Sequence, residues 1–173
     1  MDLSAEKLLV TTRCVRKRLD MQKPVALELV RECIQVAIQA PTGGNTQQWQ
    51  FVVVADEAKR AELAELYRKA WSHYRAAPGS VYELFSREPE GAARDQFHRV
   101  IESAEYLVDN LQRVPVHVIP CIKGRVDKMA GPGAGAALAA VYGSILPATW
   151  SYMLAARCRG LGTAWTTAHL MYE

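Results

Sequence analysis

The sequence predicts one layered domain, covering residues 1–173, in which α-helices pack against a β-sheet. Two short runs of apolar residues, 51–55 (FVVVA) and 115–122 (PVHVIPCI), have the composition of buried strands. Stretches with apolar residues at spacings of three and four, typical of amphipathic helices, precede and follow both runs. Half of the 173 residues are hydrophobic, which is enough for the core of a single domain.

The first predicted helix covers residues 24–40. Pro41 is expected to stop it, because proline cannot continue a helical hydrogen-bond ladder. The polar stretch 39–49 (QAPTGGNTQQW) is therefore predicted to form a loop that leads into the strand at 51–55. The apolar positions of this helix are Leu27, Val30, Ile34 and Ile38.

Two further helices are predicted between the strands. Asp56 is expected to cap the first of them, because its carboxylate can accept a free N–H group at the helix start. Residues 94–112 keep one face apolar over several turns and predict the second helix. Residues 78–91, which lie between the two, combine Pro, Gly and mixed charge without a period and predict an exposed insertion. The apolar positions of the first helix are Leu63, Leu66, Tyr67 and Ala70.

The last third of the chain predicts a loop, a buried helix and a strand. Residues 123–135 alternate Gly and Pro with charge, which indicates a mobile loop and a candidate lid. Residues 136–159 are small and apolar almost without a break, so we expect a buried helix that is split or kinked at Pro147. Gly160 is expected to end this helix, and 163–167 has the composition of a third strand.

Composition excludes several classes of protein. The net charge of +3 comes from 21 Lys and Arg against 18 Asp and Glu, so the bulk charge favours neither nucleic acid nor a membrane surface. The N-terminus carries acidic residues, and no apolar run approaches the roughly 18 residues that would span a bilayer, which predicts a cytoplasmic protein. The four cysteines are far apart and form no CxxC pair, so they indicate neither a disulfide framework nor a zinc site.

No side chain is predicted to carry out catalysis by itself. The four histidines have no metal-ligand spacing and no assignable Asp or Glu partner, and no serine lies in a GxSxG motif. The glycines at 160–162 follow a helix rather than a strand, and 131–135 (GPGAG) lacks the Lys-Ser/Thr of a phosphate loop. We therefore predict no metal site, and a bound cofactor would have to supply the reactivity.

A basic cluster lies near the N-terminus, in TTRCVRKRL (11–19). If this segment is helical, Arg13, Arg16 and Lys17 share one face and can hold a phosphate. The alternative is a solvated basic surface without a ligand. A nucleic-acid-binding arm is a third interpretation, and the absence of aromatic residues among the cations counts against it.

The loop after the first helix is the second candidate for ligand binding. Gly43 and Gly44 allow positive backbone torsions and a close approach to a ligand, while Thr42, Asn45 and Gln47 offer donors and acceptors. A turn that binds no ligand would explain the glycines and the asparagine, but not the number of amide side chains.

Three motifs in this order resemble the nitroreductase family of FMN-dependent oxidoreductases. They are TTRCVRKRL near the start, QAPTGGNTQQWQFVVV after the first helix and SILPATWSYMLAARCRGLGTAWTT late in the chain. The resemblance implies an α+β fold with a central mixed, mainly antiparallel sheet flanked by helices, in an intertwined homodimer. The long apolar helices support a large dimer interface, because one small sheet cannot cover them.

The resemblance also implies which residues bind FMN. Arg13, Cys14 and Arg16 occupy the family's Arg-Ser-x-Arg motif, with Arg13 toward the phosphate and Arg16 toward the pyrimidine end of the ring, where a cation stabilises the anionic reduced flavin. Cys14 replaces the usual serine. The residues expected to complete the site are Pro41, Thr42, Gly43, Gly44, Asn45 and Gln47 from the partner subunit's loop, with Pro147, Ala148, Thr167, His169 and Leu170.

The activity implied by the resemblance is a ping-pong transfer of electrons. NADPH or NADH gives hydride to FMN, and a nitroaromatic, a quinone or a similar acceptor then takes the electrons. Alternatives on the same fold are a reductive dehalogenase, an enone reductase, or a flavin-binding or storage protein without turnover. The sequence does not distinguish NADH, NADPH and a deazaflavin as donor, and we expect the family's closing strand and basic tail to be missing after Glu173.

Overall fold

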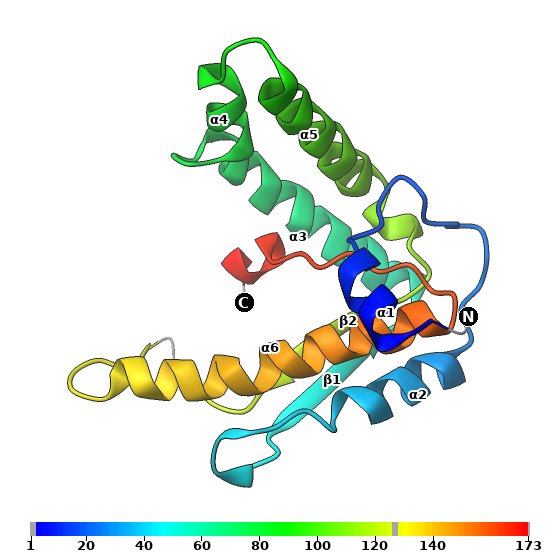
Figure 1. The fold of residues 1–173 in the computed structure, drawn as a ribbon, viewed down its shortest axis with the longest axis vertical. Coiled ribbons are helices and arrows are strands. Elements are labelled where there is room, and N and C mark those ends of the chain that lie inside the picture. Colours follow the sequence, from blue (N-terminus) through cyan, green and yellow to red (C-terminus); the bar gives the residue numbers. More distant parts are fainter. Residues whose placement is uncertain (1–2, 126–127, 173) are drawn as a thin grey trace. The chain divides into compact units, whose positions relative to one another are not determined.

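The computed structural model describes residues 3–125 and 128–172 (Figure 1). They form two compact units, each built from three separate stretches of sequence. The first unit contains residues 3–13, 24–54 and 117–163, and the second contains 14–23, 55–116 and 164–172. The single domain expected over 1–173 stays a prediction.

A two-stranded antiparallel sheet lies in the first unit. Strand β1 (Trp49–Val54) pairs with β2 (His117–Ile122) in a register that sets Trp49 opposite Ile122 and Val54 opposite His117. Both strands predicted from the apolar runs are thus confirmed. Pro120 lies inside β2, opposite Phe51, and the strand continues through it.

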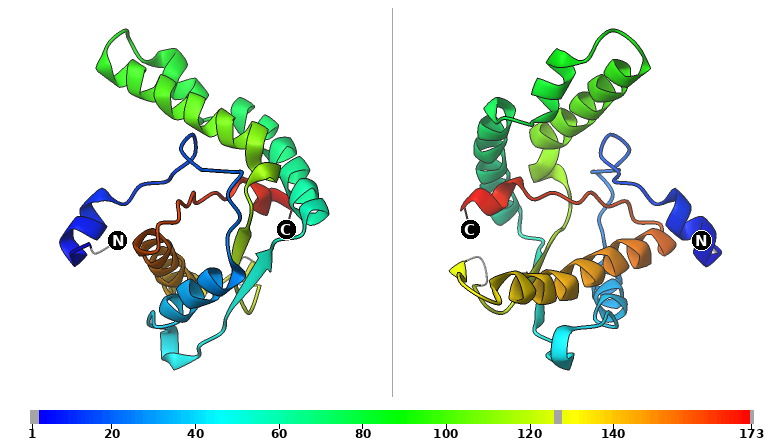
Figure 2. Two further views of the ribbon diagram at one scale, coloured as in Figure 1. Left: turned by 90° about the vertical axis from the view of Figure 1, so that its right-hand side faces the viewer. Right: turned by 60° about the vertical axis from the view of Figure 1, so that its left-hand side comes forward.

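Helices α2 (Leu27–Ala37) and α6 (Ala134–Cys158) form the core of the first unit. They pack side by side, as both views of Figure 2 show for the light-blue helix (α2) and the yellow-to-orange helix (α6). Ala37, Ala148 and Ala156 are completely buried, and such small side chains allow the two helix backbones to approach closely. The other buried residues of this pair are Val30, Cys33, Ser144, Ile145, Thr149, Tyr152, Met153 and Ala155.

The ends of these helices differ in part from the prediction. α2 ends at Ala37, four residues before Pro41, and Ile38 caps it. α6 is one continuous helix across Pro147, so it is not split there, and a kink at this proline stays a prediction. The helix buries residues on both sides of the proline, and this packing outweighs the single missing N–H group. Gly160 has a φ of 78° and follows the helix end, as predicted.

The second unit is mainly helical. Helices α3 (Glu57–Ala76) and α5 (Ala92–Asn110) confirm the two helices expected between the strands, and the Asp56 side chain accepts a hydrogen bond from the Lys59 N–H at 2.9 Å, as a cap should. A 3₁₀ turn, η2 (Leu111–Arg113), follows α5.

The segment 78–91, predicted to be an exposed insertion, contains helix α4 (Val81–Arg87), and all of its residues except Ser80 are exposed or half-buried. The Ser80 hydroxyl accepts the Glu83 N–H, and the Glu83 carboxylate accepts the Gly79 N–H. This reciprocal arrangement resembles a capping box, whose Ser-x-x-Glu spacing is visible in the sequence.

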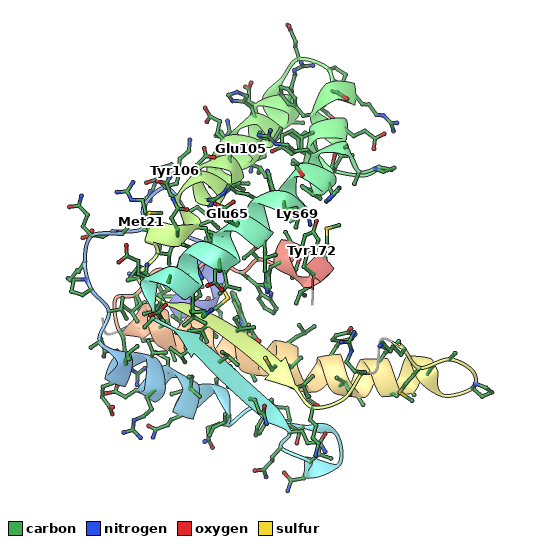
Figure 3. The ribbon with its side chains drawn as sticks, turned by 180° about the vertical axis from the view of Figure 1, so that it is seen from behind. Met21, Glu65, Lys69, Glu105, Tyr106 and Tyr172 are labelled. Atoms are coloured by element: carbon green, nitrogen blue, oxygen red, sulfur yellow. The ribbon has the colours of Figure 1, made fainter. Side chains whose placement is uncertain are left out.

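The third strand predicted at 163–167 is wrong. These residues have no regular secondary structure, and the Thr166 hydroxyl donates to the Tyr67 hydroxyl at 2.7 Å. A short 3₁₀ helix, η4 (Ala168–Tyr172), then packs on α3, where the Lys69 ammonium lies 4.6 Å from the centre of the Tyr172 ring (Figure 3). β-propensity alone does not make a strand when no neighbouring strand takes up its backbone groups.

The α+β class is confirmed by this combination of helices and an antiparallel sheet. None of the helices within 3–125 and 128–172 has the length and apolar composition needed to cross a bilayer. Residues 126 and 127 of the candidate lid lie outside the described residues, and the role of the loop stays a prediction.

Candidate functional site

The N-terminal motif begins at the end of a short helix. Helix α1 (Ala5–Thr11) stops before Arg13, so the helical face predicted for Arg13, Arg16 and Lys17 does not form. The Thr12 N–H makes the last helical hydrogen bond, to the Leu8 carbonyl. The hydroxyls of Thr11 and Thr12 also donate to carbonyls of this last turn, those of Lys7 and Leu8.

Two guanidinium groups meet at this helix end. Arg13 donates from Nη1 to the Thr12 carbonyl at 2.7 Å. Arg157, on the last turn of α6, donates from Nη1 to Thr12 Oγ1 at 3.0 Å and from Nη2 to Thr11 Oγ1 at 2.6 Å. Across the part of the chain that the structure describes, neither arginine forms an ion pair with a carboxylate.

The sequence interpretation did not assign a role to Arg157. Its position in RCRGLG could have indicated such a role, because an arginine at the end of an apolar helix needs a polar partner. Arg159, two residues later, has such a partner, because its Nε donates to Glu32 at 2.9 Å. That hydrogen bond raises the pKa of Arg159 above its usual value.

The remaining residues of the basic motif belong to the second unit. Lys17 forms a solvent-exposed ion pair with Glu102 at 3.3 Å. Burial raises the pKa of the Tyr67 phenol. The hydrogen bond from Thr166 and the nearby positive charge of Arg16 both reduce this rise. Cys14 is exposed, so its thiol is open to solvent.

The loop at residues 41–47, here called the glycine loop, is held against α6 by hydrogen bonds. The Gly43 N–H donates to Ser144 Oγ at 3.1 Å, and the Trp49 indole N–H donates to the Ser144 carbonyl at 3.2 Å. A Cβ atom at Gly43 would lie 3.4 Å from the Cβ of Ala140, so the backbone of the loop lies directly against α6. Ser144 is a buried polar residue in an otherwise apolar run, which is the sequence signal for this contact.

The backbone of the same loop is left-handed at three positions. Gly44 has a φ of 59°, Asn45 a φ of 53° and Gln47 a φ of 48°. Hydrogen bonds within the loop hold this conformation, since the Gln47 N–H donates to the Thr42 hydroxyl at 3.2 Å and the Gln47 amide donates to Asn45 Oδ1 at 2.9 Å. Part of the predicted hydrogen-bonding capacity is therefore used inside the loop.

The late residues of the predicted site are divided between the units. Pro147 and Ala148 lie on α6 in the first unit, and Ala148 is completely buried, so its side chain belongs to the core. Thr167, His169 and Leu170 lie in the second unit at η4, where the Leu170 N–H donates to the Thr167 carbonyl at 3.0 Å. The roles of all five toward a cofactor stay predictions.

The donor set of the first unit fits a phosphate-bearing flavin. Arg13 supplies the charge-assisted donors that a phosphate requires, and the loop at Pro41–Gln47 presents exposed main chain together with amide side chains. No carboxylate neutralises Arg13 within the described residues.

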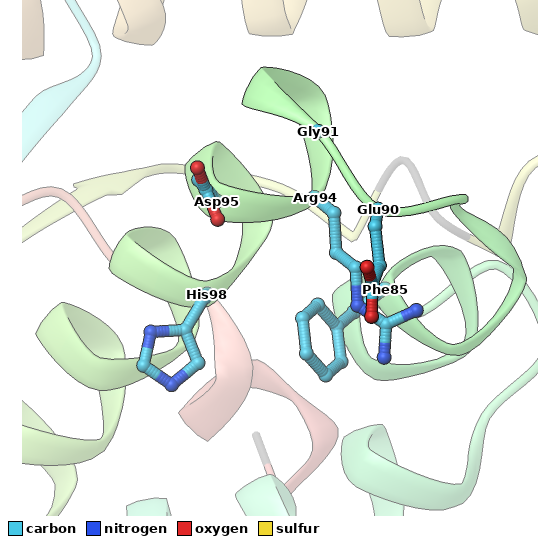
Figure 4. Close-up of a pocket in the computed structure, with 6 residues that line it drawn as sticks. All are labelled: Phe85, Glu90, Gly91, Arg94, Asp95 and His98. Atoms are coloured by element: carbon cyan, nitrogen blue, oxygen red, sulfur yellow. The ribbon is translucent and has the colours of Figure 1, made fainter.

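A separate pocket of about 320 Å³ lies in the second unit, between α4 and α5 (Figure 4). The Arg94 guanidinium lies 4.6 Å from the centre of the Phe85 ring and donates to the Glu88 carbonyl at 2.8 Å. None of the predicted cofactor-binding residues lines this pocket. The lining residues are Phe85, Glu90, Gly91, Arg94, Asp95 and His98.

Comparison with known proteins identifies relatives of this chain. The model of the nitroreductase family matches residues 9–173. The chain is 26% identical over 144 residues to the 5,6-dimethylbenzimidazole synthase of Rhodospirillum rubrum, which covers 83% of this chain and 60% of that protein. It is 32% identical over 74 residues to the chloronitrobenzene nitroreductase of Comamonas testosteroni, which covers 43% of this chain and 31% of that protein.

A solved structure shares the fold. The BluB-like flavoprotein of Clostridium difficile 630 matches with a TM-score of 0.66 at 19% identity, over 98% of this chain and 77% of that one. The nitroreductase-like fold predicted from the resemblance is thereby confirmed. The matched part of the chain spans 60% and 31% of the length of these two curated relatives.

Proposed function

This chain belongs to the nitroreductase family, and from that premise we propose that it is an FMN-dependent oxidoreductase. It would pass electrons from NADPH or NADH to nitroaromatics, quinones or similar electron-poor acceptors. The observation that carries the proposal is the family match over residues 9–173, a range that contains both the arginine motif and the glycine loop. The nitroreductase relative from Comamonas testosteroni supports the choice of acceptor class.

The protein residues would hold the cofactor and tune it. FMN, when bound, supplies the two-electron chemistry, taking hydride from a nicotinamide and giving electrons to the acceptor. Arg13 would hold the phosphate, and the cation of Arg16 would stabilise negative charge on the reduced ring. Cys14 can offer only a weak S–H donor where the family's serine offers a hydroxyl.

The glycine loop would act on the flavin of a second copy of the chain. Its bonds to Ser144 and within the loop fix its backbone before any ligand arrives, which lowers the entropy lost on binding. A homodimer is part of the proposal, and exposed apolar side chains on β1 and α6 support it. They are Val52, Val53, Tyr142 and Leu146. The cytoplasm stays the predicted location.

A second candidate function follows from the coverage of the relatives. The synthase from Rhodospirillum rubrum matches 83% of this chain, whereas the nitroreductase from Comamonas testosteroni matches 43%. A flavoenzyme that makes 5,6-dimethylbenzimidazole is therefore the alternative to a nitroreductase. Mass spectrometry for this product, after the reduced flavoprotein is exposed to air, separates the two.

The proposed function is tested by an absorption spectrum of the purified chain before and after anaerobic addition of NADPH or NADH. We expect a flavin spectrum that bleaches with one nucleotide and returns when a quinone or nitroaromatic is added. A flavin that is never reduced by either nucleotide would support a storage protein or a different donor. No flavin, even after reconstitution with FMN, would contradict the proposal.

A further inference from the structure

We propose that Arg157 is a second phosphate-binding residue, which together with Arg13 forms a two-guanidinium clamp at the end of α1. The inference rests on the proposed function, because the phosphate it would bind is that of FMN. Arg157 lies outside the family motif that led to Arg13, and its position follows from the fold alone.

The hydrogen bonds of Thr12 hold the two guanidiniums close together. The carbonyl of Thr12 accepts from Arg13, and its hydroxyl accepts from Arg157, so one buried residue joins both cations. The Thr12 hydroxyl proton is already used, because Oγ1 donates to the Leu8 carbonyl at 2.6 Å. Its lone pairs therefore face Arg157, which fixes the orientation of that side chain.

The clamp has donors left for a ligand. A guanidinium carries five N–H groups. Arg13 uses one of them and Arg157 uses two, in the hydrogen bonds that the structure describes. Guanidinium groups match the geometry of phosphate oxygens, which can accept two parallel bonds from one such group.

The charge balance at the clamp also favours an anion. Two like charges held beside the same residue repel each other, and an anion bound between them would offset this repulsion. The described residues provide no carboxylate for either arginine, whereas Arg159 on the same turn is paired with Glu32. A ligand with a negative charge near minus two would supply the missing compensation.

The alternative is that the role of Arg157 is purely structural, and that it only links α6 to α1 through its hydrogen bonds to the two threonine hydroxyls. In that case its loss would disturb the end of α1 and weaken the binding of any flavin equally. Riboflavin distinguishes the two roles, because it has the ring system of FMN but no phosphate.

The test measures the dissociation constants of FMN and riboflavin for the full chain by flavin fluorescence quenching. Arg157→Gln is expected to weaken FMN binding by about tenfold or more and to leave riboflavin binding within about twofold. Arg157→Lys, which keeps the charge, should retain part of the preference for FMN over riboflavin. This variant replaces Arg157→Gln in the test if the glutamine variant does not fold. Arg159→Gln is the matched control, and its preference for FMN over riboflavin should equal that of the unaltered chain.

Equal losses for FMN and riboflavin in Arg157→Gln, or no loss for either, would overturn the inference while leaving the proposed function intact. If the unaltered chain binds no FMN, the proposed function fails first, and inorganic phosphate then becomes the probe. A rise in the unfolding temperature with phosphate that disappears in Arg157→Gln would support the clamp without a flavin. No such rise in the unaltered chain would overturn the clamp as well.

Discussion

The hydroxyl oxygen of Ser144 accepts a hydrogen bond from the backbone N–H of Gly43 at 3.1 Å, across 101 residues of sequence. The same hydroxyl donates to the Ala140 carbonyl one turn earlier at 2.7 Å, so it is satisfied in both directions. This one buried side chain positions the loop that we propose contacts the flavin.

Replacing Ser144 with alanine is therefore expected to destabilise the chain by about 1–3 kcal/mol, because it leaves the Gly43 N–H without its partner. Urea unfolding measures the change. Thr149→Val is the control, since Thr149 lies on the same helix and, among the described residues, its hydroxyl bonds to the Ile145 carbonyl at 2.9 Å, which the helix already uses. A loss in Thr149→Val as large as that in Ser144→Ala would contradict the assigned role.

The left-handed backbone of Gly44 gives a second prediction. Gly44→Ala should cost about 1–2 kcal/mol in the free energy of unfolding, because a Cβ atom strains a residue with a φ of 59°. Gly143→Ala, in the middle of α6 with open space around its Cα, should instead stabilise by roughly 0.5–1 kcal/mol. If both variants changed stability in the same direction, the loop conformation described here would be wrong.

Arg16 gives a prediction about the cofactor that rests on the proposed function. Arg16→Gln should lower the two-electron midpoint potential of bound FMN by roughly 30 mV or more, since about 1.4 kcal/mol of stabilisation of the reduced anion would be lost. Equilibration with a reference dye measures the potential. Lys17→Gln, which removes a neighbouring cation paired with Glu102 on the surface, should leave the potential unchanged.

The Glu105 carboxylate predicts a dependence of stability on pH. Burial alone would raise the pKa of Glu105, but hydrogen bonds from Arg75, Tyr82 and Trp71 outweigh it and lower the pKa below its ordinary value of 4.5. A carboxyl whose pKa is lower in the folded chain stabilises the fold above about pH 4.5, and this contribution is lost as the pH falls through the folded value.

Glu105→Gln should accordingly cost about 1–2 kcal/mol at pH 7, and less as the pH falls below 4. Urea unfolding at several pH values measures the difference. Glu65→Gln, which breaks an exposed pair with Arg68 on α3, is the control and should change the pH dependence far less. A constant difference between Glu105→Gln and the unaltered chain from pH 7 to pH 3 would contradict the prediction.

The sequence predicted the elements whose signals are local. The runs at 51–55 and 115–122 became strands, and the Asp56 cap was correct, because consecutive apolar residues and a capping carboxylate act over a few residues. Helix α4 was not predicted, because the Pro and Gly residues around it indicate a loop, although Ser80 and Glu83 have the spacing of a helix cap.

The interpretations that failed depended on distant partners. Residues 163–167 have strand composition, but Thr166 bonds to Tyr67, 99 residues earlier, and no strand lies beside them in the described structure. The contacts of Arg157 could not be predicted for the same reason, because its partners Thr11 and Thr12 are about 145 residues away. Three-residue and four-residue periodicities carry no information about such pairs.

The assembly of the first unit from separated stretches has a consequence for synthesis on the ribosome. The apolar face of α2 is covered by α6, and roughly 100 residues separate the two helices. At the usual translation rates this leaves about 5–20 s in which Val30 and Cys33 have no partner, while α3, α4 and α5 can already fold against one another. The nascent chain therefore passes through a stage in which α3, α4 and α5 are folded while the apolar face of α2 is still uncovered, because α6 has not yet been made. A chaperone would be needed at that stage.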